Sequence, residues 1–325
     1  MKPLIEIKSL KKYFPVYGGL LSRVVGHVKA VENVSLHIGH KETLGLVGES
    51  GCGKTTVGRM SIRLIEKTAG QVLFEGTDIF QLNKKQMAQL RPRMQIIFQD
   101  PYSSLNPRFT VERIIGEAML IHGTATKKNQ NDQIKAVMEQ VGLSPRYMKR
   151  YPHEFSGGQR QRIGIARAIA LNPDYIVCDE PVSALDVSIQ AQIINLLQDL
   201  QEETGISMLF ISHDLNVVKH LSHRTAVMYL GRLVEVAPTS VLNKEPAHPY
   251  TRALLSAKPS LNPRDRSHRT VLGGDVPSPL NPPSGCHFHP RCPEVMDRCR
   301  TEEPKHLQIG NDHQVHCHLY DKNLP

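Results

Sequence analysis

The sequence has no run of about 18 apolar residues, the length that a helix needs to cross a bilayer. We therefore expect no segment of this chain to span a membrane. Residues 1–7 also lack a long apolar stretch followed by a small-residue cleavage site, so no secretory signal is expected. Both absences favour a protein of the cytosol.

The composition is not extreme in any respect, so we do not expect the chain to be disordered. The 325 residues are 40% hydrophobic and 22% charged, as is ordinary for a globular protein of roughly two domains. The net charge of +9 permits anionic partners such as nucleotide, nucleic acid or an acidic membrane surface. The same charge equally fits a soluble protein that is simply kept away from neutrality.

Cysteine is scarce until the C-terminal end. Of the six cysteines, Cys52 and Cys178 lie within motifs described below, and the remaining four are Cys286, Cys292, Cys299 and Cys317. In a protein without a secretory signal, such a cluster favours metal binding over disulfides.

One glycine-rich stretch organises the chain: Gly48-Glu49-Ser50-Gly51-Cys52-Gly53-Lys54-Thr55-Thr56, which reads G-x-x-x-x-G-K-T. Glycines allow consecutive backbone N–H groups to face phosphate oxygens. Lys54 supplies a charge for the β- and γ-phosphates, and Thr55 offers a hydroxyl to a magnesium ion. An apolar run at 43–47 and a helical pattern at 56–65 supply the expected strand, loop and helix, so the motif predicts a nucleoside-triphosphate site.

The hydrophobic pattern elsewhere predicts an α/β fold. Apolar and polar residues alternate over 4–10 and 28–38, which predicts an N-terminal antiparallel β subdomain, and the glycine-rich stretch 16–27 between them is predicted to be a loop. Further strands are expected at 70–74 and 94–98.

Regular alternation of strands and helices follows. Buried strands at 175–178 and 206–212 alternate with helices at 159–171 and 188–203, which predicts a mainly parallel sheet.

Two composition shifts divide the chain. Helical spacing over about 100–160 indicates an inserted helical subdomain within a domain spanning 1–260. Residues 261–325 form a proline- and histidine-rich extension with few apolar positions, so we expect it to need a metal staple to fold.

A second glycine-rich motif, Phe155-Ser156-Gly157-Gly158-Gln159, opens a predicted helix. Bare N–H groups at a helix N-terminus form an anion site, to which Ser156 adds a hydroxyl. A flexible hinge is the alternative interpretation.

Polar residues also end three predicted strands. Asp179 follows a buried strand and would reach the metal, and Glu180 is placed to polarise an attacking water. Gln99 could reach a metal or water, and His213 stands where a γ-phosphate sensor is needed, although a lone strand-end histidine is more often structural. Asp186 lies in a turn before a helix, where capping is an equally good account.

Taken in order, these motifs resemble those of ATP-binding-cassette ATPases over residues 4–255: Walker A, glutamine loop, signature, Walker B, D-loop and histidine switch. The resemblance implies that ATP and Mg²⁺ are bound and that Phe14 (or Tyr13) stacks on adenine. It assigns Gln99 and Asp179 to the metal and water shell, Glu180 to catalysis and His213 to the γ-phosphate. Phe155 stands where the family usually has leucine, an apolar exchange that leaves Ser-Gly-Gly-Gln intact.

The resemblance also implies partners. Each ATP would lie between the phosphate loop of one subunit and the signature helix of a second ATPase subunit, either a copy or a paralogue. Two membrane permeases and an extracytoplasmic substrate-binding protein would complete the assembly, with this chain peripheral at the cytoplasmic face of the inner membrane. No nucleic acid is expected.

Three segments, 98–107, 248–255 and 277–286, resemble the dipeptide/oligopeptide importer branch, and in particular its second, "F"-type ATPase subunit. Nickel importers belong to the same branch, so a nickel substrate is the first alternative. A nucleic-acid-linked cassette ATPase is a second alternative, and a non-catalytic regulatory cassette is a third.

The spacing C-x5-C-x6-C-x17-C of the four late cysteines is not the paired C-x2-C of a zinc ribbon. Four thiolates suit an iron–sulfur cluster as well as zinc, for which a nearby histidine could replace one cysteine. The residues alone leave these two open, and only the resemblance favours a 4Fe–4S cluster.

Overall fold

The computed structural model describes residues 2–19, 22–256 and 273–321. Its N-terminal sheet is antiparallel, with strand order β2-β1-β4-β5, which confirms the predicted β subdomain. These strands are β1 (Ile5–Gly18), β2 (Arg23–Ile38), β4 (Ala69–Phe74) and β5 (Thr77–Asp78).

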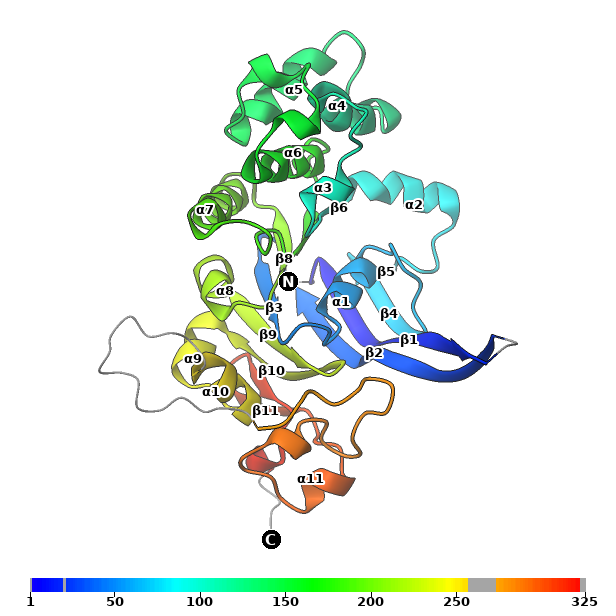
Figure 1. Cartoon of the computed structure of the whole chain (residues 1–325), viewed down its shortest axis with the longest axis vertical. Helices are drawn as coiled ribbons and strands as arrows, with labels where there is room; N and C mark the ends of the chain where they lie inside the picture. Colours follow the sequence, from blue (N-terminus) through cyan, green and yellow to red (C-terminus); the bar gives the residue numbers. More distant parts are fainter. Residues whose placement is uncertain (1, 20–21, 257–272, 322–325) are drawn as a thin grey trace.

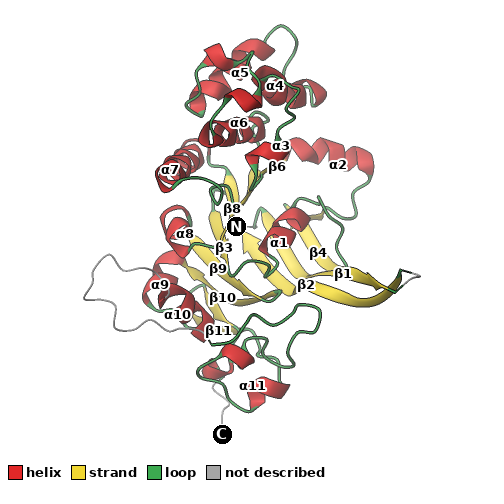
Figure 2. Cartoon of the chain, in the orientation of Figure 1, coloured by secondary structure: helices red, strands yellow, loops and turns green. Residues whose placement is uncertain are grey.

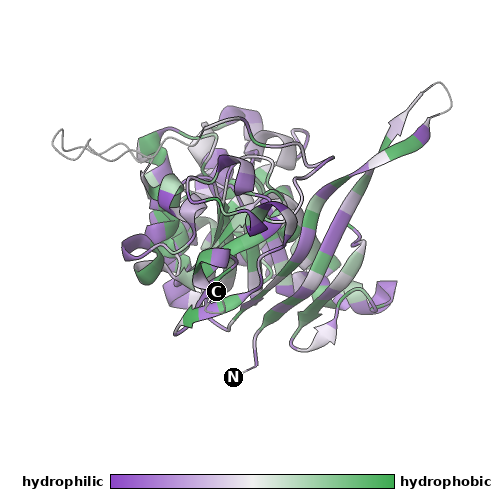
Figure 3. Ribbon diagram, turned by 90° about the horizontal axis from the view of Figure 1, so that it is seen from below, coloured by the Kyte–Doolittle hydropathy of each residue, from purple (hydrophilic) through white to green (hydrophobic). Residues whose placement is uncertain are grey.

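The predicted loop at 16–27 is wrong. β1 and β2 stay paired out to Gly18 and Arg23, and the hairpin that they form stands out from the body in Figure 3. Tyr17, Val24 and Val25 are exposed there, so this pairing depends on backbone hydrogen bonds rather than on a buried face, and the hydrophobic pattern gives no signal for it.

The larger sheet has the order β11-β12-β10-β9-β3-β8-β7-β6. Its strands are β3 (Thr43–Val47), β6 (Met94–Ile97), β7 (Tyr175–Asp179), β8 (Ser207–Ser212), β9 (Arg224–Tyr229), β10 (Arg232–Pro238), β11 (Leu307–Gly310) and β12 (His313–Val315). Strands β6, β7, β8, β3 and β9 are parallel, as predicted, and the remaining strands add in antiparallel fashion. Every residue of β3 is buried between β8 and β9, so the phosphate loop starts from the middle of the sheet.

Helices cover this sheet and form a separate group beyond it (Figures 1 and 2). The helices near the sheets are α1 (Lys54–Ser61), α2 (Lys84–Leu90), α7 (Val187–Thr204), α8 (Leu215–Leu221), α9 (Thr239–Lys244) and α10 (Pro249–Ser256). The group at the top of Figure 1 comprises α4 (Val111–Ile121), α5 (Gln130–Gln140) and α6 (Gly157–Ile169), where helical spacing predicts helices, and the short helix α3 (Pro101–Ser104) lies below it beside β6. None of the helices in the described ranges is long and apolar enough to cross a bilayer.

The C-terminal extension shares its core with the rest of the chain. Strand β12 pairs with β10, where Glu235 faces Val315, and the short helix α11 (Arg298–Thr301) lies below the sheet in Figure 1. Phe288 is 1% exposed and belongs to the main hydrophobic core. The expectation that the extension depends on a metal staple is therefore not confirmed. The predicted boundary at residues 260 and 261 lies outside the described residues.

Candidate nucleotide site

The loop between β3 and α1 is held by close backbone packing. A Cβ atom built on Gly48 would lie 2.1 Å from the carbonyl oxygen of Met228, and one built on Gly53 would lie 2.1 Å from that of Ala30. Gly53 also has a φ of 105°, which side-chain-bearing residues rarely adopt. Glycine is therefore required at both positions, and the loop is wedged between β2 and the end of β9.

Lys54 and Thr55 begin α1 beneath this loop. The Lys54 ammonium donates to the carbonyl oxygens of Gly48 (2.8 Å) and Glu49 (3.0 Å). Ser50 and Gly51 are exposed, Cys52 is buried and Thr56 is half-buried. The structure thus places the sequence-predicted loop residues around one basic group, which is itself only 4% exposed.

A buried carboxylate lies next to this loop. The Thr55 hydroxyl donates to Asp179 at 2.6 Å, and Arg59 lies 3.5 Å from the other oxygen of that carboxylate. Burial raises the pKa of Asp179, although the hydrogen bond from Thr55 and the charge of Arg59 oppose the shift. A cation beside Asp179 would offset this desolvation, so Thr55 and Asp179 fit a magnesium site.

Glu180 is the point at which the strand-end residues meet. Its carboxylate accepts a hydrogen bond from the Gln99 amide (3.2 Å), lies 3.2 Å from Nδ1 of His213, and is 3.9 Å from the Lys54 ammonium. Glu180 has a φ of 47°, a conformation that is uncommon for residues with a side chain and that clusters at functional sites. A cavity of about 60 Å³ lies beside it, lined in part by His213 and Ser183.

The second glycine-rich motif, as predicted, forms the start of a helix. Ser156 caps α6, where its hydroxyl accepts from the N–H of Gln159, and the Gln159 side chain accepts in return from the N–H of Ser156. A Cβ built on Gly158 would lie 2.5 Å from Ile189, so the two glycines pack against the turn and helix that follow Glu180.

Two predicted residues make fewer contacts. Asp186 stands at the N-cap position of α7, but its side chain makes no capping hydrogen bond, so capping does not account for it. Phe14 is 39% exposed, with the Lys12 ammonium 4.8 Å from its ring centre. The Tyr13 hydroxyl donates to Glu32, which leaves Phe14 as the freer of the two aromatic rings.

The four late cysteines are all free thiols. Cys317 lies within electrostatic reach of the other three, and burial raises its pKa to about 12. Within residues 2–19, 22–256 and 273–321, however, no group of three or more His, Cys, Asp or Glu side chains is arranged to hold a metal ion. The predicted metal site is therefore not confirmed.

Sequence reasoning missed the residues that fix Glu49. Arg291 forms a bidentate ion pair with the Glu49 carboxylate, and the Tyr250 hydroxyl accepts a hydrogen bond from the Glu49 N–H. Arg291 is separated from Glu49 by 242 positions, so no local spacing could have linked the two.

Comparisons with known proteins agree with this geometry. Residues 31–183 match the ABC transporter family, and residues 234–299 match the oligopeptide/dipeptide transporter C-terminal region. The chain is 52% identical to the oligopeptide transport ATP-binding protein AppF of Bacillus subtilis, over 98% of this chain and 97% of that protein. It is also 52% identical to the probable peptide ABC transporter ATP-binding protein y4tS of Sinorhizobium fredii, over 97% of this chain and 90% of that protein.

Solved structures are similar as well. The ATP-binding cassette MJ0796, a dimer with ADP and phosphate in a post-hydrolysis state, matches with a TM-score of 0.64 and 26% identity, over 72% of this chain and 98% of that one. The protein cbiO1 of Clostridium perfringens, part of the ABC transporter complex cbiONQ, matches with a TM-score of 0.64 and 22% identity, over 75% of this chain and 92% of that one, and shows likeness of fold alone.

The fold, the phosphate loop and these relatives define an ATP-binding cassette, and the chain belongs to the ABC transporter family. Within that family it is an ATPase that carries the oligopeptide/dipeptide transporter C-terminal region.

Replacing Gly53 by alanine tests the wedged loop. We expect Gly53→Ala to lose most nucleotide binding, because its Cβ would displace the loop from Ala30. Gly51→Ala is the matched control: Gly51 also has a positive φ, but an added Cβ meets nothing within 4 Å. Both variants carry similar backbone strain of about 1–2 kcal/mol, because both positions have a positive φ. Equal losses of ATP binding, measured by calorimetry, would therefore contradict the importance of the close contact between Gly53 and Ala30.

Proposed function

We propose that this chain hydrolyses ATP to energise the import of dipeptides or oligopeptides through partner membrane permeases. The match of residues 234–299 to the peptide-transporter C-terminal region supports the substrate class, as do the printed names of the relatives. The convergence of Gln99, Lys54 and His213 on Glu180 is the observation that carries the ATPase mechanism.

In this mechanism, the Lys54 ammonium exchanges the carbonyl oxygens of the loop for phosphate oxygens. Thr55, Asp179 and Gln99 would hold Mg²⁺, which supplies positive charge to the phosphates. Glu180 accepts a proton from the attacking water, while Gln99 and His213 hold its carboxylate in position. Phe14 would stack on the adenine ring, the remaining loop residues 48–56 would cradle the phosphates, and Asp186 would face the neighbouring subunit.

A second ATPase subunit, a copy or a paralogue, would complete the site. The helix start at Ser156, Gly157, Gly158 and Gln159 would provide a second anion site, separate in sequence and fold from the phosphate loop. Closure of two chains head to tail would bring both to one nucleotide, and hydrolysis would release them. The chain would lie peripherally at the cytoplasmic face of the cell membrane, in contact with two permeases. A substrate-binding protein would deliver the substrate to these permeases.

We retain the domain division of residues 1–260 and 261–325, with helices inserted over about 100–160, as a proposal. The nickel importer of the same branch is the alternative substrate class, and the names of the relatives favour peptide over it. No observation favours a nucleic-acid partner.

Uptake of labelled dipeptide and labelled nickel by cells tests the substrate class. Cells would carry the permeases together with the parent chain, with Glu180→Gln, or with Glu203→Gln, a control exposed on α7. We expect peptide uptake in the parent and the control but not in Glu180→Gln, because the amide cannot accept the proton of water. Nickel uptake without peptide uptake would overturn the proposal that peptides are the substrate. Unchanged peptide uptake in Glu180→Gln would overturn the proposal that Glu180 accepts the proton of water.

We also propose that Cys286, Cys292, Cys299 and Cys317 hold a 4Fe–4S cluster, with zinc as the alternative. Backbone N–H groups of Phe288, Glu294 and Leu319 lie against the sulfurs of Cys286, Cys292 and Cys317, where they would stabilise thiolates. A cluster is wider than a single ion, so its thiolates need not converge on one point. The lack of a single-ion site among the described residues therefore weighs more against zinc.

Metal analysis of protein purified without oxygen separates these alternatives. We expect about four iron and four sulfide per chain if the cluster is present, and Cys292→Ser should lose both. Cys178→Ser is the control, because Cys178 is buried in β7 away from the extension. Zinc without iron or sulfide would contradict the cluster.

A further inference from the structure

Glu49 of the phosphate loop is held from three directions. Its backbone N–H donates to the Tyr250 hydroxyl (3.0 Å), its carbonyl oxygen accepts from Lys54, and its carboxylate pairs with Arg291. Tyr250 and Arg291 lie far along the chain from the loop, on α10 and in the C-terminal extension. The conformation of the loop therefore depends on segments that contribute no phosphate-binding motif.

The ion pair with Arg291 is well formed. Two guanidinium nitrogens lie 2.9 and 3.1 Å from the two carboxylate oxygens, and the Arg291 side chain is only 8% exposed. A partly buried bidentate pair of this kind fixes both partners geometrically, unlike an exposed surface ion pair.

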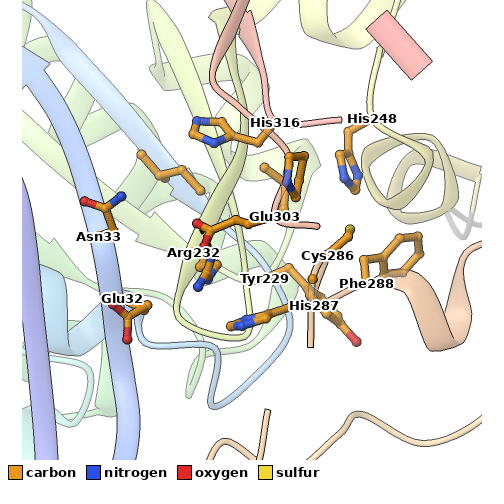
Figure 4. Close-up of a pocket in the computed structure, with 14 residues that line it drawn as sticks. Glu32, Asn33, Tyr229, Arg232, His248, Cys286, His287, Phe288, Glu303 and His316 are labelled. Atoms are coloured by element: carbon orange, nitrogen blue, oxygen red, sulfur yellow. Dashed lines mark ion pairs between the residues drawn. The ribbon is translucent and has the colours of Figure 1, made fainter. Parts of the chain in front are cut away.

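Beneath the ion pair lies a buried aromatic cluster drawn from three segments. The rings of Tyr229 at the end of β9, Tyr250 of α10 and Phe288 of the extension have centres 4.8 to 5.3 Å apart. Figure 4 shows Phe288 beside His248 and near Tyr229, at the cavity of about 40 Å³ next to Cys286. The extension therefore contributes Phe288 to the aromatic cluster below the loop and Arg291 to the ion pair with Glu49.

A second route joins the extension to the loop through the turn after β9. Nδ1 of His287 donates to the carbonyl oxygen of Leu230 at 3.0 Å. The next residue, Gly231, donates its N–H to the carbonyl oxygen of Cys52 at 3.0 Å. Arg232 in turn pairs with Glu303 of the extension, and both residues are labelled in Figure 4.

We propose that the C-terminal extension is a positioning element of the phosphate loop, acting through the Arg291–Glu49 ion pair. Arg291 does not touch nucleotide; it fixes Glu49, and with it the backbone N–H groups that bind phosphate. It also neutralises a carboxylate that would otherwise stand unpaired beside the bound phosphates. Because Arg291 precedes Cys292 directly in sequence, the folded state of the cysteine segment would set the affinity of the site for ATP.

Arg291→Gln tests this role in the full-length chain. We expect the Kd for ATP to rise about ten-fold or more, because the loop loses the charge-assisted hydrogen bonds that fix Glu49. The kcat at saturating ATP should stay close to that of the parent, because the residues around Glu180 are unchanged. Glu294→Gln is the matched control: it breaks the ion pair between the extension and Arg252 of α10, which does not involve the loop, and it leaves the backbone N–H beside Cys292 unchanged.

A double-mutant cycle with Glu49→Gln separates positioning from a general loss of stability. If Arg291 acts through Glu49, adding Arg291→Gln to Glu49→Gln should weaken ATP binding far less than it does in the parent. Additive losses, an unchanged Kd in Arg291→Gln, or an equal loss in Glu294→Gln would each overturn the proposal. Should Arg291→Gln melt below the assay temperature, Arg291→Lys replaces it in the cycle, since lysine keeps the charge but not the bidentate geometry.

Discussion

The close packing of the phosphate loop against two carbonyl oxygens is the constraint on which the rest of the site depends. With Gly48 packed against Met228 and Gly53 against Ala30, the backbone of the loop lies in close contact with β9 and β2 in this arrangement. That arrangement places Thr55 against Asp179 and Lys54 near Glu180, although these residues come from different strands and helices. The central position of β3 makes this possible, because the loop leaves the sheet where the ends of β7 and β8 also arrive.

The two carboxylates at this edge of the sheet have different surroundings. Asp179 is buried and its pKa is raised, so a cation would stabilise its charged form. Glu180 is held by Gln99 and His213 in a strained backbone conformation, with Lys54 close by. The two acids therefore differ in burial and in hydrogen-bond partners, which supports the separate roles proposed for them.

The sequence predicted what local spacing can encode. The loop from Gly48 to Thr56, the strand ending at Asp179 and the helix starting after Ser156 depend on neighbouring residues, and each is present in the structure. The paired hairpin over 16–27 and the core shared by the extension could not be predicted in this way. Both arise from backbone pairing or burial against distant partners, as do Arg291 on Glu49 and Phe288 beneath it.

In the role proposed for the C-terminal extension, the extension and the phosphate loop form one structural unit. Amide hydrogen exchange on the full chain, compared between the parent and Phe288→Ala, tests it most directly. Removing this buried ring should speed exchange in the extension and also at the loop residues 48–54, because both rest on the same aromatic cluster. Faster exchange in the extension alone, with the loop exchanging as in the parent, would contradict the claim.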